Sequence, residues 1–117
     1  MVKNAKVNYD YENDILYVFV GNRAKDSLEI DNFVIDFSHE NKVVGVEIFN
    51  ASELISKLVL SKISKDMLSK IKEASLSFYQ SKELFYIVIG LAMMVENKLK
   101  EIPIQVPAPK VAIAAQI

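Results

Sequence analysis

The sequence predicts an α+β domain in which an N-terminal four-stranded antiparallel meander is followed by two short helices and then by C-terminal antiparallel strands. Short β-branched and aromatic runs alternate with Asn, Asp and Gly turn residues up to residue 49. Between residues 53 and 73 the hydrophobic period becomes helical, and beyond residue 74 β-forming residues return. Together these three observations indicate the fold class.

The first two strands are expected at residues 6–11 and 15–20. Alternation places Val7, Tyr9 and Tyr11 on one face of the first strand, whereas the second is apolar on both faces and suits a more central position. The polar pair Glu12-Asn13 is expected to turn between them.

The next two strands are expected at residues 28–37 and 42–49, joined by the polar segment 38–41. The first of them should bend near Asp31-Asn32. Gly45, inside the second, permits a bulge or the close approach of another group.

Two short helices should follow. Asn50 with Glu53 three residues later is typical of a helix N-terminus, and Ser64 can cap a second helix. Both helices have apolar residues at helical spacing: Leu54, Ile55, Leu58 and Val59 in the first, and Met67, Leu68 and Ile71 in the second.

Residues 83–99 fit a buried helix by composition, but strands are favoured. Residues 85–89 are β-branched or aromatic, Gly90 would interrupt a helix, and residues 76–79 supply a hairpin partner. A turn at residues 95–98 leads to a last strand, which Pro103 should place at a sheet edge. Residues 107–109 should end regular structure, and the apolar tail 111–117 is expected to dock on its own sheet or on a neighbouring subunit.

One domain of 117 residues is expected, with a family-like meander at 7–52, a helical insert at 53–73, a β region at 74–110 and the tail. The alternation predicts a core made of Val7, Tyr9, Leu16, Val18, Ile35, Val44, Val46, Ile48, Leu54, Leu58, Phe78, Ile87 and Ile89.

Composition excludes several kinds of site. The chain has no cysteine, which rules out disulfides and thiolate metal sites, and its single histidine, His39, cannot form a multi-histidine centre. No signal peptide or membrane-spanning run is apparent, so a cytoplasmic protein is expected. No cofactor is predicted. The hydrophobic content of 51% with a mean hydropathy of +0.19 favours apolar contact between subunits. A homo-oligomer is therefore expected, and a dimer is the favoured form.

Charge is unevenly distributed, although the net charge is only −1. Residues 1–54 have 5 Lys/Arg and 10 Asp/Glu, a net −5, and residues 55–117 have 9 and 5, a net +4. This polarity could orient head-to-tail contacts between subunits, or it could simply reflect two differently charged solvated faces.

Three motifs in the first half resemble the domain of unknown function family 2283: residues 9–18, 33–37 and 42–52, in this order and spacing. The resemblance implies a four-stranded β-meander followed by a helix, in a protein from bacteria or archaea. It implies no established activity, cofactor or catalytic residue. Because family members occur beside small predicted toxins, it also suggests an antitoxin-like partner role. The chain departs from the family pattern at Asn32-Phe33 and beyond residue 52.

Two groups of carboxylates are candidate polar sites. Asp10, Glu12 and Asp14 alternate like calcium ligands, but they lack the glycine and glutamate of an EF-hand loop, and turn chemistry explains them equally well. Asp36 and Glu47, on strands expected to pair, could converge with Asp10 on one sheet face and supply an acid–base pair of carboxylates for a hydrolase, or all three could be ordinary solvated residues.

The two helices contain a candidate basic patch that includes Lys62, Lys65 and Lys70. Such a patch could contact phosphates in a nucleic-acid-binding protein, but lysines opposite an apolar stripe are also the usual solvated face of a helix. No catalytic, cofactor or metal residue is assigned. The favoured function is therefore a non-enzymatic interaction module that self-associates, with nucleic-acid binding and carboxylate-dependent hydrolysis as alternatives.

Overall fold

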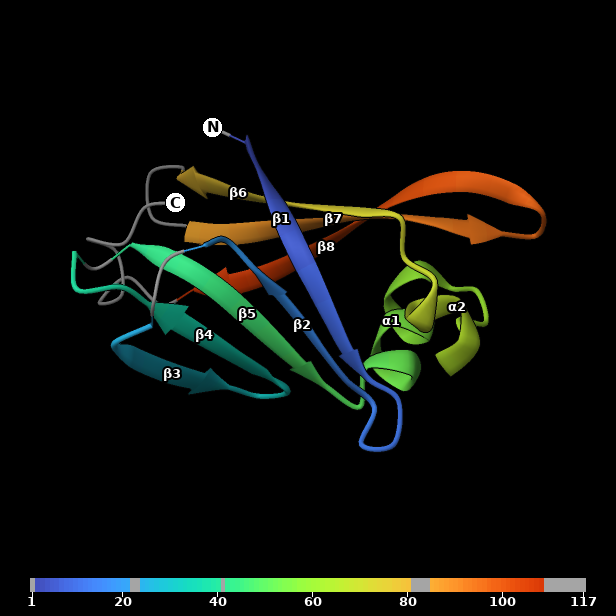
Figure 1. The fold of residues 1–117 in the computed structure, drawn as a ribbon, viewed down its shortest axis with the longest axis horizontal. Helices are drawn as coiled ribbons and strands as arrows, with labels where there is room; N and C mark the ends of the chain where they lie inside the picture. The colour runs from blue at the N-terminus through green and yellow to red at the C-terminus, as the bar shows by residue number, and fades with distance from the viewer. Residues whose placement is uncertain (1, 22–23, 41, 81–84, 109–117) are drawn as a thin grey trace.

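The computed structural model describes residues 2–21, 24–40, 42–80 and 85–108. Figure 1 shows them as a strongly twisted antiparallel sheet with two short helices at one end. The strand order across the described sheet is β3-β4-β5-β2-β1-β6-β7-β8. The elements are β1 (Val2–Asp10), β2 (Ile15–Phe19), β3 (Asp26–Ile30), β4 (Phe33–Phe37), β5 (Val43–Phe49), α1 (Ala51–Val59), α2 (Lys65–Ser69), β6 (Glu73–Gln80), β7 (Phe85–Val95) and β8 (Lys98–Ala108).

Strand β1 joins the two halves of the sheet. Its residues 6–10 pair with β2, and its residues 2–5 pair with β6, so that it runs diagonally between the halves in Figure 1. Inward side chains of both halves form one hydrophobic core, which includes Leu16, Val18, Ile35, Val46, Ile48, Leu76, Ile87, Ile89, Leu91, Met93, Ile104 and Val106. This shared core holds the N-terminal meander on the C-terminal strands.

The predicted α+β class, with an N-terminal antiparallel meander and two short helices, is confirmed. One strand prediction was wrong in detail, because the expected strand 28–37 is a hairpin of β3 and β4. Asp31, at the predicted bend, has a φ of 51°, which lets the chain reverse within two residues. Strand β2 then pairs with β5 rather than with the segment that follows it.

The helices agree with the predicted periodicity except at one position. Ile55 and Leu68 are buried, whereas Leu58, predicted as core, is exposed because in the last turn of α1 it is Val59 that packs against the core. The other predicted core residues are buried or pack against the core. Ser64 caps α2 as predicted, accepting a bond from the Met67 N–H at 3.1 Å.

The ambiguous segment 83–99 contains a strand, β7, over its described residues. Glu96 and Asn97 both have positive φ, as a two-residue type I′ hairpin requires. Pro103 lies in the edge strand β8 as predicted, but β8 continues to Ala108, so the expected end at residue 107 was wrong. The predicted tail, residues 111–117, lies outside the described part of the chain.

Among the described residues, no helix has the length and apolar character needed to cross a membrane.

Candidate functional site

Asp14, at the end of the first hairpin, is bonded to the N-terminus of α1. Its carboxylate accepts from the Ser52 N–H at 3.1 and 3.2 Å and from the Ser52 hydroxyl at 2.7 Å. Its carbonyl oxygen accepts from the Ala51 N–H at 3.0 Å. The expected cap, Asn50, makes no side-chain capping bond, so Asp14 replaces it although it precedes Asn50 by 36 positions.

Tyr9 completes this junction from β1. Its hydroxyl donates to Oδ1 of Asp14 at 2.6 Å. Partial burial alone would raise the pKa of Asp14, but the hydrogen bonds from Tyr9 and Ser52 outweigh burial and hold this pKa below its usual value. Burial and the same bond to Asp14 raise the pKa of Tyr9. The Asp14 carboxylate is therefore ionised at neutral pH and accepts hydrogen bonds from three donors, the Tyr9 hydroxyl and the N–H and hydroxyl of Ser52.

Asp10 has a local role in the same hairpin. Its carboxylate accepts from the Asn13 N–H at 3.1 Å and from the Asn13 side-chain amide at 2.8 Å. These bonds lower the pKa of Asp10. Since Asp10 and Asp14 direct their oxygens to different donors, their alternation in sequence follows from turn and cap chemistry. No group of three or more potential metal ligands occurs in the described residues.

The second polar cluster lies on the outward face of the N-terminal strands and contains Tyr17, Asp36 and Glu47. Tyr17 is directly opposite Glu47 in register, and Asp36 is opposite Gly45. Asp36 is buried and accepts from the Ser27 hydroxyl at 2.6 Å. Burial and a hydrogen bond to Asp36 raise the pKa of Tyr17 to about 12. Burial and then the charge of Asp36 raise the pKa of Glu47.

The structure thus brings together two of the three predicted carboxylates. Asp36 and Glu47 interact electrostatically, whereas Asp10 belongs to the turn beyond the end of β1. A carboxyl with a raised pKa beside a buried carboxylate can act as a proton donor in principle. Here Tyr17 and Ser27 already donate hydrogen bonds to the Asp36 carboxylate, as is typical of a buried polar group with a structural role.

Replacing Glu47 by glutamine is expected to stabilise the fold at neutral pH by up to about 1 kcal/mol. A raised folded pKa means that Glu47 contributes most stability below its unfolded pKa and loses it as pH rises through the folded pKa. Denaturant unfolding should therefore show a gain for Glu47→Gln at neutral pH and none near about pH 3.5. Glu29→Gln, on exposed β3, is the matched control. Equal behaviour of the two variants would contradict the assigned coupling.

The three predicted patch lysines are not equivalent. The Lys65 ammonium lies 5.5 Å from the Tyr11 ring centroid, beside the acidic hairpin, and the Tyr11 hydroxyl donates to Asp66 at 3.1 Å. Lys62 is exposed in the turn between the helices. Lys70 instead lines a shallow groove of about 250 Å³ with Asp66, Met67, Lys72 and Met94.

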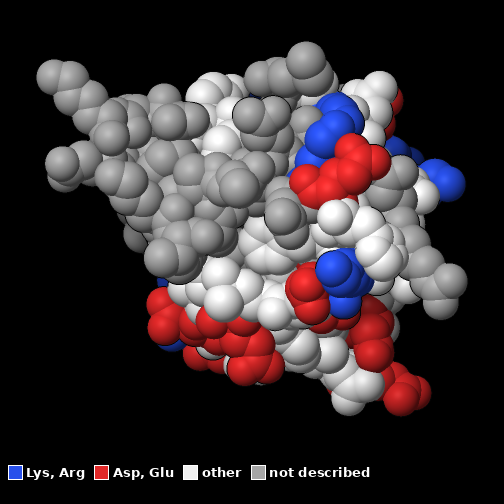
Figure 2. All heavy atoms as spheres, turned by 90° about the vertical axis from the view of Figure 1, so that its left-hand side faces the viewer, with Lys and Arg blue, Asp and Glu red and all other residues white. Residues whose placement is uncertain are grey.

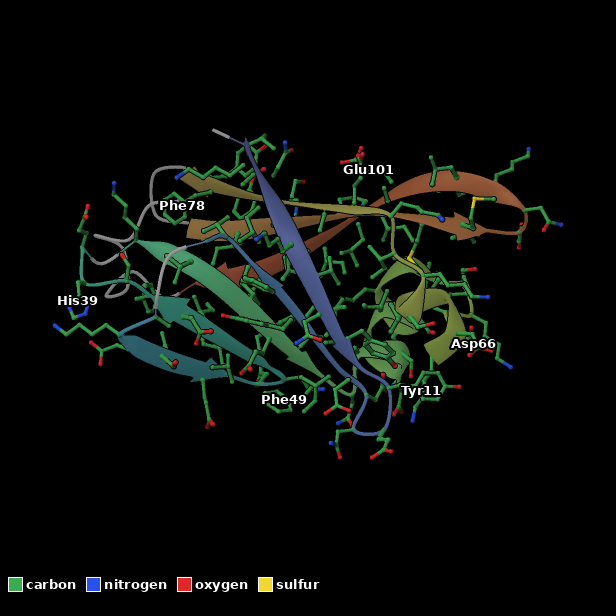
Figure 3. All side chains as sticks on the ribbon, viewed as in Figure 1. Tyr11, His39, Phe49, Asp66, Phe78 and Glu101 are labelled. Atoms are coloured by element: carbon green, nitrogen blue, oxygen red, sulfur yellow. The ribbon has the colours of Figure 1, made fainter. Side chains whose placement is uncertain are left out.

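Figure 3 places His39 at the opposite end of the molecule from Tyr11 and Asp66. Glu101 lies on the outer side of the C-terminal strands, away from His39. His39 is exposed in the loop between β4 and β5. At this position His39 is far from both Asp66 and Glu101, so neither can serve as its partner in acid–base chemistry.

The Asp14 junction defines a structural unit that starts within β1 and closes at the first turn of α1. Residues 6–52 match the family model DUF2283, described as a protein of unknown function. The DUF2283 segment ends at Ser52, the residue that Asp14 caps. Its match confirms the resemblance read from the three motifs.

Two curated relatives extend the comparison. A 52-residue stretch is 48% identical to an uncharacterized protein of Methanocaldococcus jannaschii and covers 44% of this chain and 45% of that protein. Over 95 residues the chain is 24% identical to a Methanosarcina mazei protein named "Putative hypoxanthine phosphoribosyltransferase", covering 80% of this chain and 72% of that protein. The chain thus spans less than half of the first relative. No solved structure matches.

Sequence reasoning missed the partners of two key residues. Ser52 meets Asp14 only after β5 has returned to the first hairpin, so no local spacing predicts the contact. Tyr17 covers Gly45 across the β2–β5 pair, and register is required to see this contact.

Proposed function

We propose that this chain is a non-enzymatic protein-interaction module that self-associates. The observation that carries the proposal is the exposed apolar surface at the helical end and the β7–β8 hairpin. Leu60 is 92% exposed, Leu99 63% and Leu58 51%, and Met94 is the direct cross-strand partner of Leu99. Large exposed apolar side chains grouped on neighbouring elements favour contact with another protein surface.

The polar residues support the same proposal. Asp10 and Asp36, two of the three carboxylates that a hydrolase would use, each accept hydrogen bonds from other residues of the fold, as does Asp14. The name of the Methanosarcina mazei relative would suggest binding of a phosphorylated ligand, and a helix N-terminus with free backbone N–H groups is a common phosphate site. The N-terminus of α1 is already capped by Asp14. An antitoxin-like role would add a different protein partner to the same surface.

Leu99→Ser is expected to weaken self-association by about tenfold, because it removes one large apolar side chain from the contact. Val2→Ser is the matched control, since Val2 is exposed to a similar extent, 61%, but lies at the start of β1. Sedimentation velocity measures both variants. A loss of association in Val2→Ser with none in Leu99→Ser would contradict the proposed surface.

A further inference from the structure

The described sheet ends in two edge strands, β3 and β8, each with one neighbouring strand. Figure 1 shows β3 and the tip of the β7–β8 hairpin at opposite ends of the molecule. An edge strand exposes backbone N–H and C=O groups that can pair with a strand of another chain. Two edges at opposite ends can be used at the same time by two different neighbours.

Among the described strands, the outer edge of β8 has no partner, and it can offer backbone N–H groups over only part of its length. Val95 and Lys98 flank the two-residue turn and so exchange both backbone hydrogen bonds. Alternation from this pair leaves Leu99, Glu101 and Pro103 at positions whose backbone nitrogen points away from β7. Because proline has no N–H, the available edge runs from Lys98 to Ile102 and stops at Pro103.

The length and chemistry of β3 match this open stretch. β3 has five residues, Asp26–Ile30, as many as the open stretch of β8. Asp26 and Glu29, with Asp31 in the turn after Ile30, outweigh Lys25 and make this edge acidic, and Figure 2 shows acidic side chains gathered at the level of β3. The open stretch of β8 has Lys98 and Lys100 with one acidic residue, Glu101.

Further lysines lie on the β6 side of β7, where a groove separates α2 from the strand. Lys70 and Lys72 line it together with Met94, which lies opposite Leu99 in the hairpin. An incoming strand on residues 98–102 would meet the lysines of β8 itself, whereas Lys70 and Lys72, which follow α2, contribute positive charge only from the other side of β7. One acidic residue, Asp66, also lines the groove.

We infer that self-association occurs head to tail, by addition of the acidic edge β3 of one copy to residues 98–102 of β8 in a second copy. This inference rests on the proposed function and names its contact. The contact is heterologous, so a pair of copies keeps one free β3 and one free β8 edge and can grow into a longer assembly. Charge complementarity selects β3 as the partner over a second β8 edge, which would bring like charges together.

A proline substitution tests the strand pairing. Glu101→Pro removes an outward N–H inside the open stretch and leaves β7–β8 pairing intact, as Pro103 already does. Gln105→Pro removes an equivalent outward N–H beyond Pro103 and is the matched control. By sedimentation velocity, Glu101→Pro should lose at least about tenfold in association while Gln105→Pro keeps it. Equal effects would overturn the inference.

Charge exchange tests the partner without a backbone change. One variant has Asp26→Lys with Glu29→Lys, and the other has Lys98→Glu with Lys100→Glu. Each alone should associate at least about tenfold more weakly, and an equimolar mixture should form heterodimers through the two unaltered edges. If the β3 variant associates normally, or if mixing restores nothing, the head-to-tail contact is wrong although self-association stands. A wild-type monomer would instead remove the proposed function itself.

Discussion

Replacing Asp14 by alanine is expected to lower the free energy of unfolding by about 3 kcal/mol. The substitution removes an ionised acceptor that bonds Tyr9, the Ser52 N–H and the Ser52 hydroxyl. It also places alanine at a φ of 54°, which L-residues other than Asn, Asp and Gly rarely adopt. Denaturant unfolding followed by circular dichroism measures the loss.

Two control variants separate these causes. Asp14→Asn keeps a residue that tolerates positive φ but removes the charge, so its effect should be intermediate. Asp10→Ala removes a carboxylate from the same hairpin that is exposed and bonded to Asn13 and the backbone of Glu12, all within the turn, and should cost about 1 kcal/mol or less. If Asp14→Ala and Asp10→Ala destabilised equally, Asp14 would not link the hairpin to α1.

The lowered pKa of Asp14 gives this prediction a pH dependence. A carboxylate with a depressed folded pKa contributes stability above its unfolded pKa and loses this contribution as pH falls through the folded pKa. The difference between wild type and Asp14→Ala should therefore be largest at neutral pH. It should shrink in acid toward the part due to backbone strain.

Gly45→Ala is expected to destabilise the fold by about 2 kcal/mol. A Cβ at residue 45 would lie 2.7 Å from Oη and 2.8 Å from Cε1 of Tyr17, so the Tyr17 ring must move. That ring is stacked on Phe19 with centroids 4.7 Å apart, and its hydroxyl bonds Asp36. Movement would therefore break the stack and the hydrogen bond as well.

A double-mutant cycle tests this explanation of Gly45. In a Tyr17→Ala background the added methyl group has space, so Gly45→Ala should cost less than about 0.5 kcal/mol. Gly21→Ala is the matched glycine control, because a Cβ there meets nothing within 4 Å. An undiminished cost of Gly45→Ala without the tyrosine ring would place the constraint in the backbone instead.

Local patterns predicted most of the fold. The hairpin of β1 and β2 and the strand β7 follow from alternation, β-forming residues and Asn or Asp turns. The pairing of β1 with β6 was not predicted, because residues 2–5, Val-Lys-Asn-Ala, do not alternate apolar and polar side chains and so give no strand signal alone. Leu58 was misplaced because its spacing fits the apolar stripe of α1, but in the last turn of the helix Val59 packs against the core and Leu58 does not.

The contacts of the candidate site were harder to predict from the sequence than the fold. Asp36 and Glu47 were singled out together because their strands were expected to pair, and pairing is local in the hairpin of β4 and β5. Asp10 was added to them by type of residue alone, and its contact with Asn13 keeps it in the turn. Which residues of β8 point their backbone N–H groups away from β7 depends on the β7–β8 register, counted from the hairpin turn. This register cannot be read from composition.

Sedimentation equilibrium of the wild-type chain, over a roughly hundredfold range of concentration, tests self-association most directly. The single chain has a mass of 13.2 kDa. The proposed function predicts an apparent mass that rises with concentration to at least twice this value. A constant 13.2 kDa at every concentration would contradict it.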